Sequence, residues 1–147
     1  MPEKRTLQRA REDKREGKAP STQAGEFVRE EIDHIREGKH GARSTEQAIA
    51  IGLSKARRAG VNLPPPEKGK SSASTRENAR HALQHRGKKT STKRAKAVRS
   101  ALKHEGRSAA SKPALAKHAR VAAKRRTAAD RSAAARKAAR TRAHASA

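Results

Sequence analysis

The chain has 147 residues and a formal net charge of +24, from 38 Lys and Arg against 14 Asp and Glu. Only 15 residues are Leu, Ile, Val or Phe, about half of the roughly 20% below which a strongly charged chain is expected to be disordered. This composition excludes a large hydrophobic core, and the absence of Cys excludes disulfides and thiolate metal sites. We see no membrane span or secretory signal and expect a cytoplasmic protein.

The charge and the apolar residues occupy different halves of the chain. Residues 71–147 hold 22 Lys and Arg against three acids, a net charge of +19, whereas residues 1–70 carry a net charge of +5. Ten of the 15 large apolar residues precede residue 71. We therefore expect a small helical module followed by a basic arm.

Residues 1–19 are predicted to form a weak helix or a charged arm. The segment 3–16 contains good helix formers, but Leu7 is its only large apolar residue. A short helix is marginal in water without an apolar face to pack.

Residues 20–63 are predicted to form a helical hairpin. Its first helix, residues 22–37, is expected to follow a cap at Ser21 or Thr22. The residues at i, i+4 and i+7 make one apolar stripe, formed by Val28, Ile32 and Ile35. The acidic run in this helix is expected on its solvent-exposed face, where it could also pair with the basic arm; it consists of Glu30, Glu31 and Asp33.

The second helix of the hairpin is predicted over residues 45–59. Ser44 and Gln47 are typical of a capping box, and Gly60 is the expected stop. Ile49 and Leu53 are expected to face the first helix, with Ala48 and Gly52 small enough for close contact, and Arg57 is expected on the exposed face.

Residues 64–74 are predicted to be a Pro/Ser-rich linker, because Pro64–Pro66 favours an extended spacer; Val61 and Leu63 just before it are expected to fold back over the hairpin. Residues 75–106 are predicted to form two short basic helices, the first opened by a capping box at Ser74 and Glu77.

Residues 107–147 are predicted to be a basic arm that is helical or partly disordered. A cap is expected at Ser111, and 17 of the last 39 residues are Ala, which favours helix. Repulsion between neighbouring cations opposes the helix, so we expect it to strengthen on a polyanion.

The cationic clusters of the second half predict nucleic-acid binding. A solvated surface normally mixes signs, and here the excess is 22 to three. Without Trp, Tyr or an evident base-reading set, contacts to phosphate are expected, with little sequence selectivity. The candidate binding residues are Lys88, Lys89, Lys93, Arg94, Lys124, Arg125, Arg126, Arg136, Lys137, Arg140 and Arg142.

A candidate phosphate loop precedes the second hairpin helix. Lys39, Arg43 and Ser44 lie where free backbone N–H groups at a helix N-terminus attract anions. The loop lacks the order of residues of a P-loop, and a flexible turn with a cap is the simpler interpretation.

No catalytic site, metal site or cofactor is predicted. His81 and His85 are four residues apart, but cations surround them and no third ligand is evident. The other histidines are scattered: His34, His40, His104, His118 and His144. No nucleophile and base share a core that would hold them in place, so we expect a non-enzymatic protein.

The string QAIAIGLSKARRAG, residues 47–60, together with the preceding GKHG, residues 38–41, resembles a family of small, basic, uncharacterised bacterial proteins. Some members carry labels as plasmid stabilisation or DNA-binding proteins, so the resemblance implies a helical, DNA-binding protein without a known mechanism. The basic tail is similar in composition to those of linker histones.

These features predict an all-α protein that is nucleoid-associated or histone-like and binds DNA without sequence selectivity. The hairpin, residues 20–63, is the candidate surface for a homo-oligomer or a protein partner. Three alternatives stay open: an RNA- or ribosome-binding protein, a stress-protective hydrophilin, which would not need the charge excess, and an enzyme, which is the least expected of the three.

Overall fold

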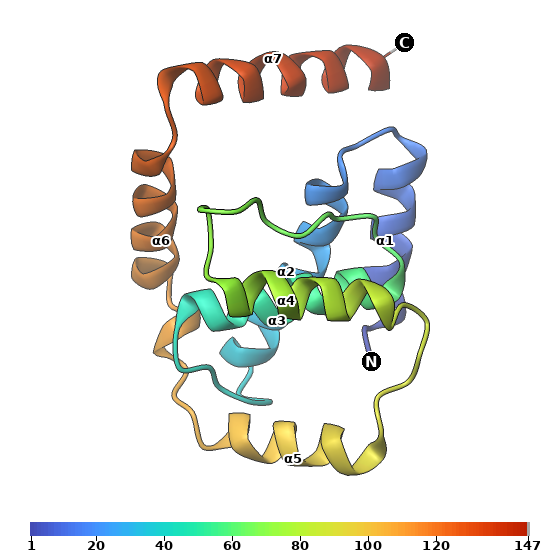
Figure 1. The fold of residues 1–147 in the computed structure, drawn as a ribbon, viewed down its shortest axis with the longest axis vertical. Coiled ribbons are helices and arrows are strands. Elements are labelled where there is room, and N and C mark those ends of the chain that lie inside the picture. Colours follow the sequence, from blue (N-terminus) through green and yellow to red (C-terminus); the bar gives the residue numbers. More distant parts are fainter. Residues whose placement is uncertain (147) are drawn as a thin grey trace.

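The computed structural model describes residues 1–146, and this part of the chain is all-α, as the sequence predicts. It contains no strand, and its elements are shown in Figure 1. They are α1 (Lys4–Arg15), α2 (Pro20–Arg36), α3 (Thr45–Ala59), α4 (Ala73–Gln84), α5 (Thr92–Lys103), a 3-10 turn η1 (Ser108–Ala110), α6 (Lys112–Arg125) and α7 (Ala128–Ala145).

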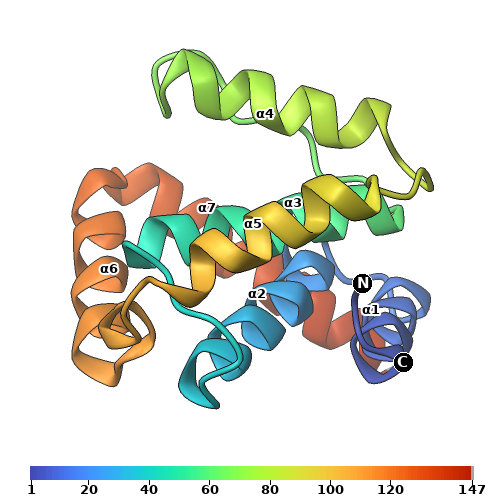
Figure 2. The same ribbon diagram turned by 90° about the horizontal axis from the view of Figure 1, so that it is seen from below.

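The first four helices pack in the order of the chain. α1 lies against α2, α2 and α3 form the predicted hairpin, and α4 lies against α3. Figure 2 shows α4 on the side of α3 that faces away from α2. α1 is therefore a packed helix and not an arm: its Ala10 is buried in one cluster with Phe27 of α2 and Ala56 of α3.

Small residues set the distance between α2 and α3. Ala48, Gly52 and Ala56 are buried, whereas Ile49 and Leu53 are only half-buried. A Cβ added to Gly52 would lie 2.6 Å from the Cα of Val28, so the two backbones nearly touch. We had expected Ile49 and Leu53 to face the first helix. In the structure these larger side chains flank the helix contact, and the small residues form its centre.

Some helix ends follow the sequence signals and others do not. The hydroxyl of Ser44 accepts a hydrogen bond from the backbone N–H of Gln47 at 3.1 Å, and Gly60 ends α3 with a φ of 106°. The prediction of a cap at Ser21 or Thr22 is wrong, because α2 already begins at Pro20, whose fixed φ suits a first helical residue. α4 is capped by Ser72 and not by Ser74.

Three charged residues that were expected at the surface are buried. Glu30, Glu31 and Arg57 are 5%, 0% and 5% exposed, whereas Asp33 is exposed as predicted. Glu30 accepts a hydrogen bond from the backbone N–H of Glu3. Burial of a charge is tolerated only where such partners replace water, and periodicity along one helix does not reveal partners from other elements.

Arg57 holds the proline-rich linker against α3. Its Nε donates to the carbonyl of Leu63 at 3.1 Å, and its Nη2 donates to the carbonyl of Pro64 at 3.2 Å. Burial lowers the pKa of the guanidinium from its ordinary value. The linker thus begins with a fixed direction, and Val61 and Leu63 pack on the hairpin as predicted.

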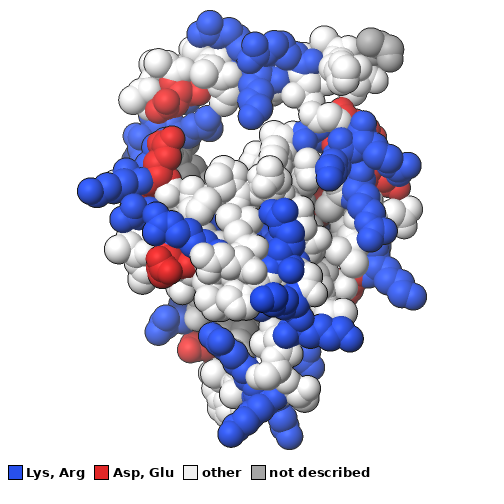
Figure 3. Space-filling view, turned by 45° about the vertical axis from the view of Figure 1, so that its right-hand side comes forward, with Lys and Arg blue, Asp and Glu red and all other residues white. Residues whose placement is uncertain are grey.

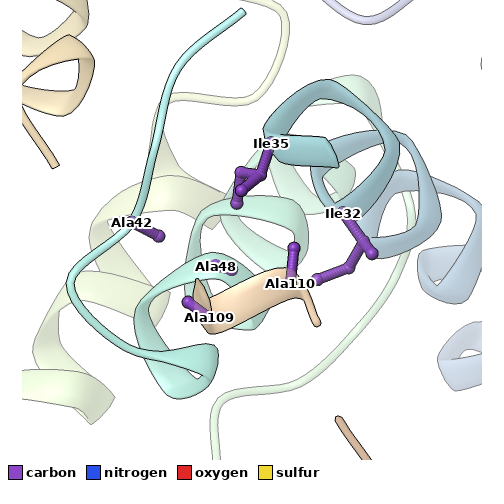
Figure 4. Packing of buried hydrophobic residues seen from close by; sticks show 6 residues of the cluster. All are labelled: Ile32, Ile35, Ala42, Ala48, Ala109 and Ala110. Carbon is purple, nitrogen blue, oxygen red and sulfur yellow. The ribbon is translucent and has the colours of Figure 1, made fainter. Parts of the chain in front are cut away.

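Residues 102–110 dock on the hairpin. Ala109 and Ala110 of η1 are buried beside Ile32 and Ala48 (Figure 4). The buried hydroxyl of Thr45 donates to the carbonyl of Ala109 at 2.7 Å. Part of the basic second half therefore completes the core of the first half.

The hairpin loop is bonded to the same segment. The N–H groups of Gly41 and Ala42 donate to the carbonyls of Leu102 and Gly106 at 2.9 and 3.0 Å. A Cβ at residue 41 would lie 2.0 Å from the carbonyl oxygen of Glu105. Only glycine allows this approach of two backbones.

The basic arm beyond residue 111 is helical in the structure. Of the two alternatives that the sequence left open, the helical arm is confirmed and partial disorder is not. Ser111 caps α6, as predicted, by accepting a hydrogen bond from the N–H of Ala114 at 3.2 Å. α7 opens with a reciprocal capping box between Thr127 and Asp130, which the sequence analysis missed. Figure 1 shows α6 running along one side of the molecule to α7 at the top.

Candidate nucleic-acid interface

The nineteen Lys and Arg residues between residues 88 and 146 are all exposed. Within the described part of the chain, every ion pair of a Lys or Arg with a carboxylate lies at or before Arg80. In the first half, by contrast, Lys18 lies 2.8 Å from Asp13, and Arg9 lies 3.6 Å from Glu26. The chain after residue 87 therefore presents cations without acidic partners.

The candidate binding residues occupy several elements. Lys88 and Lys89 lie in the turn before α5, and Lys93 and Arg94 lie in its first turn. Those of the arm lie at the end of α6 and on α7; they are Lys124, Arg125, Arg126, Arg136, Lys137, Arg140 and Arg142. Figure 3 shows Lys and Arg spread over this face from one end of the molecule to the other, so the positive charge is extended and not confined to one pocket.

The cations of α7 surround the helix. At about 100° per residue, they fall on all sides of it; these residues are Arg131, Arg136, Lys137, Arg140 and Arg142. Of the residues of α7, only Ala134 and Thr141 are even half-buried. A helix with this pattern can meet phosphates from several directions but presents no single face to the bases.

Two of the three candidate phosphate-loop residues line a cleft. Arg43 and Ser44 border a space of about 420 Å³ together with Lys117 and His118 of α6. Lys39 does not line this cleft. Its ammonium lies 3.0 Å from Glu37, and this hydrogen bond raises the pKa of Lys39 above its ordinary value.

The N-terminus of α3 already holds an anion of the protein itself. Hydrogen bonds from the backbone N–H of Glu46 and from His118 lower the pKa of the Glu46 carboxyl, whose oxygen lies 3.3 Å from Nδ1 of His118. The hydroxyl of Ser44 is engaged as the cap. This geometry favours the capping interpretation of the loop over phosphate binding.

The two histidines considered from the sequence stack on each other. The ring centroids of His81 and His85 are 3.9 Å apart, and the charge of His85 is the main cause that lowers the pKa of His81. No carboxylate joins them in the described residues as a metal-binding group.

A different pair of histidines meets a buried acid, which the sequence analysis missed. The ring centroids of His34 and His40 lie 6.3 Å apart, and both rings approach Glu31. The i,i+3 spacing of Glu31 and His34 was a signal that both share a helix face. His40 reaches the same face because the loop after α2 turns back toward the helix, and no helical spacing in the sequence indicates that turn.

Among residues 1–146, no helix has both the length and the apolar character needed to cross a membrane. Residues 8–68 are similar to a family of unknown function (DUF6496). No curated protein and no solved structure matches the chain. The matched range includes α2 and α3 but none of the four later helices, so the basic half lies outside the similarity.

Proposed function

We propose that the protein binds nucleic acid, with duplex DNA as the expected partner, through phosphate contacts and without sequence selectivity. The observation that carries this proposal is the set of nineteen exposed Lys and Arg residues after residue 87 that make no ion pair with a carboxylate in the described chain. Binding of such cations to DNA releases condensed counterions, which supplies most of the affinity of non-specific complexes.

A role in solubility alone does not account for this pattern. Soluble surfaces mix charges of both signs, as the first half of this chain does with its ion pairs at Arg9, Lys18 and Lys39. The described chain after residue 87 leaves its Lys and Arg residues without carboxylate partners, and they repel one another along each helix. An external polyanion relieves that repulsion.

The experiment compares two triple variants of equal charge in the full chain. The first replaces Lys124, Arg125 and Arg126 by Gln, and the second replaces the ion-paired Arg9, Lys18 and Lys39 by Gln. Fluorescence anisotropy with a random-sequence duplex gives the dependence of log K on log salt. If about eight cations engage phosphate, the wild-type slope is roughly −7, and the first variant loses about 2.7 of it.

The second variant is expected to retain nearly all of the wild-type slope. Equal losses in both variants would show that only total charge matters, and a wild-type slope shallower than about −2 would refute the proposal. Tight selection of one duplex from a random pool would refute the lack of selectivity. A structured RNA that competes better than duplex DNA of equal length would assign RNA as the partner.

A further inference from the structure

We propose that Glu31, His34 and His40 form a transition-metal site, with Zn²⁺ as the ion that this donor set suits. Two imidazoles and one carboxylate are a common protein ligand set for zinc, with a fourth position open to water. The proposal concerns the hairpin and is independent of nucleic-acid binding.

The carboxylate of Glu31 has one oxygen without a hydrogen bond. Its side chain is 1% exposed, and Oε1 accepts a hydrogen bond from the ammonium of Lys55. Oε2 makes no hydrogen bond, although Nε2 of His40 lies 3.1 Å away. A buried charged oxygen without a partner is costly, and this one is directed toward a ring nitrogen.

The hydrogen-bond partner of Nδ1 shows which nitrogen of His40 carries the proton. Nδ1 lies 2.9 Å from the carbonyl oxygen of Gly41, which can only accept, so Nδ1 carries the hydrogen. In the neutral ring, Nε2 then has a lone pair that faces the Glu31 carboxylate. Two electron-rich atoms at 3.1 Å repel each other unless a proton on Nε2 or a metal ion joins them.

His34 repeats this arrangement with the nitrogens exchanged. Its Nε2 donates to the carboxylate of Glu3 at 2.9 Å, so its Nδ1 is left with the lone pair, 4.0 Å from Glu31 Oε1. Histidines that bind metals almost always donate their second N–H to a carboxylate or a backbone carbonyl. Both histidines here have such an outer partner.

The distances allow one ion to contact all three residues. One ligand atom from each lies within 4.8 Å of the others. Tetrahedral zinc with bonds of about 2.0–2.2 Å separates its ligand atoms by roughly 3.4 Å. Glu31 Oε2 and His40 Nε2, 3.1 Å apart, are near that spacing. The ligand atom of His34, within 4.8 Å of the others, has to approach them by at most about 1.4 Å.

The local charge favours a cation in spite of the protein's net charge. The carboxylates of Glu3, Glu30 and Glu31 gather here, opposed by the ammonium groups of Lys39 and Lys55. The stacked histidines of α4, by contrast, have no carboxylate in a ligand group. A bound ion would tie α2 to the loop that holds residues 102–106, so it would stabilise the docking of the second half.

The test titrates Zn²⁺ into the chelator-treated full chain, followed by calorimetry, with Co²⁺ absorption as the spectroscopic probe. One ion per chain and an absorption of tetrahedral Co²⁺ are expected, and Tm rises by roughly 5–10 °C at a hundredfold excess over Kd. His40→Gln and His34→Gln each weaken binding by at least tenfold. Glu3→Gln, an exposed outer partner, weakens binding by about 10- to 100-fold.

The matched control is the double variant His81→Gln/His85→Gln, which also removes two histidines and is expected to bind Zn²⁺ as the wild type does. Loss of binding in this control would place the ion on α4 and overturn the proposal. Absence of one-to-one binding and of a Tm shift in the wild type would also overturn it, without relying on any variant. The Glu31 carboxylate would then be neutralised by a protonated His40 and not by a metal.

Discussion

The close contact of α2 and α3 at Gly52 leads to a quantitative prediction. In Gly52→Ala, the new Cβ would lie 2.6 Å from the Cα and 2.9 Å from the N of Val28, compared with 3.4–4 Å in ordinary contacts. Because these atoms are backbone, no rotamer change relieves the clash, and the helices must separate. Overpacking of this kind costs about 1–3 kcal/mol.

Gly25 provides a matched control for this substitution. It lies within α2, is exposed, and a Cβ there meets no atom within 4 Å. Replacing a glycine in a helix by alanine gains about 0.8–1.0 kcal/mol from propensity alone, and both substitutions share this gain. We expect Gly25→Ala to stabilise the protein by about 1 kcal/mol and Gly52→Ala to destabilise it by about 0–2 kcal/mol.

Thermal and urea unfolding of the full chain, followed by circular dichroism, measure the difference. A difference of about 1–3 kcal/mol corresponds to roughly 3–9 °C in Tm for a domain of this size. If both variants gain stability to the same extent, the helices do not approach at Gly52 and the proposed packing of the hairpin is refuted.

Three further outcomes are expected. Arg57→Ala removes two hydrogen bonds to the proline-rich linker and destabilises the chain by about 2–3 kcal/mol in urea unfolding; an unchanged midpoint would place this side chain in solvent. Thr45→Val loses the buried bond to the carbonyl of Ala109, costs about 1 kcal/mol and speeds tryptic cleavage between residues 103 and 112; equal cleavage rates would contradict the docking. The N–H and hydroxyl of Thr127 lower the pKa of Asp130, so its capping contribution is present above the unfolded value of 3.8 and is lost as the pH falls from that value through the lower pKa of the folded state. Circular dichroism between pH 5 and 2 should show this loss, and Asp130→Asn should reduce it.

The sequence by itself determined the all-α class, most helix positions, several caps and the asymmetry of charge. Ser44, Gly60 and Ser111 act on backbone groups within a few residues of themselves, so their roles can be inferred from local order. The same locality applies to the exposed cations of α5–α7, each of which is solvated without a partner from a distant segment. A lysine side chain stays in water by default, so its exposure can be inferred without knowing which distant segments lie nearby.

The tertiary structure alone decided which polar residues are buried and which segments meet. Glu31 was predicted to be exposed because its own helix has an apolar stripe elsewhere. In the structure, Lys55 of α3 donates to its Oε1 in place of water, and His40 of the hairpin loop lies beside its Oε2. Ala109 and Ala110 are buried by a hairpin more than 60 residues earlier in the chain. Burial of a charged or very small side chain depends on the free energy of contacts with distant partners, and neither hydrophobicity nor periodicity encodes those partners.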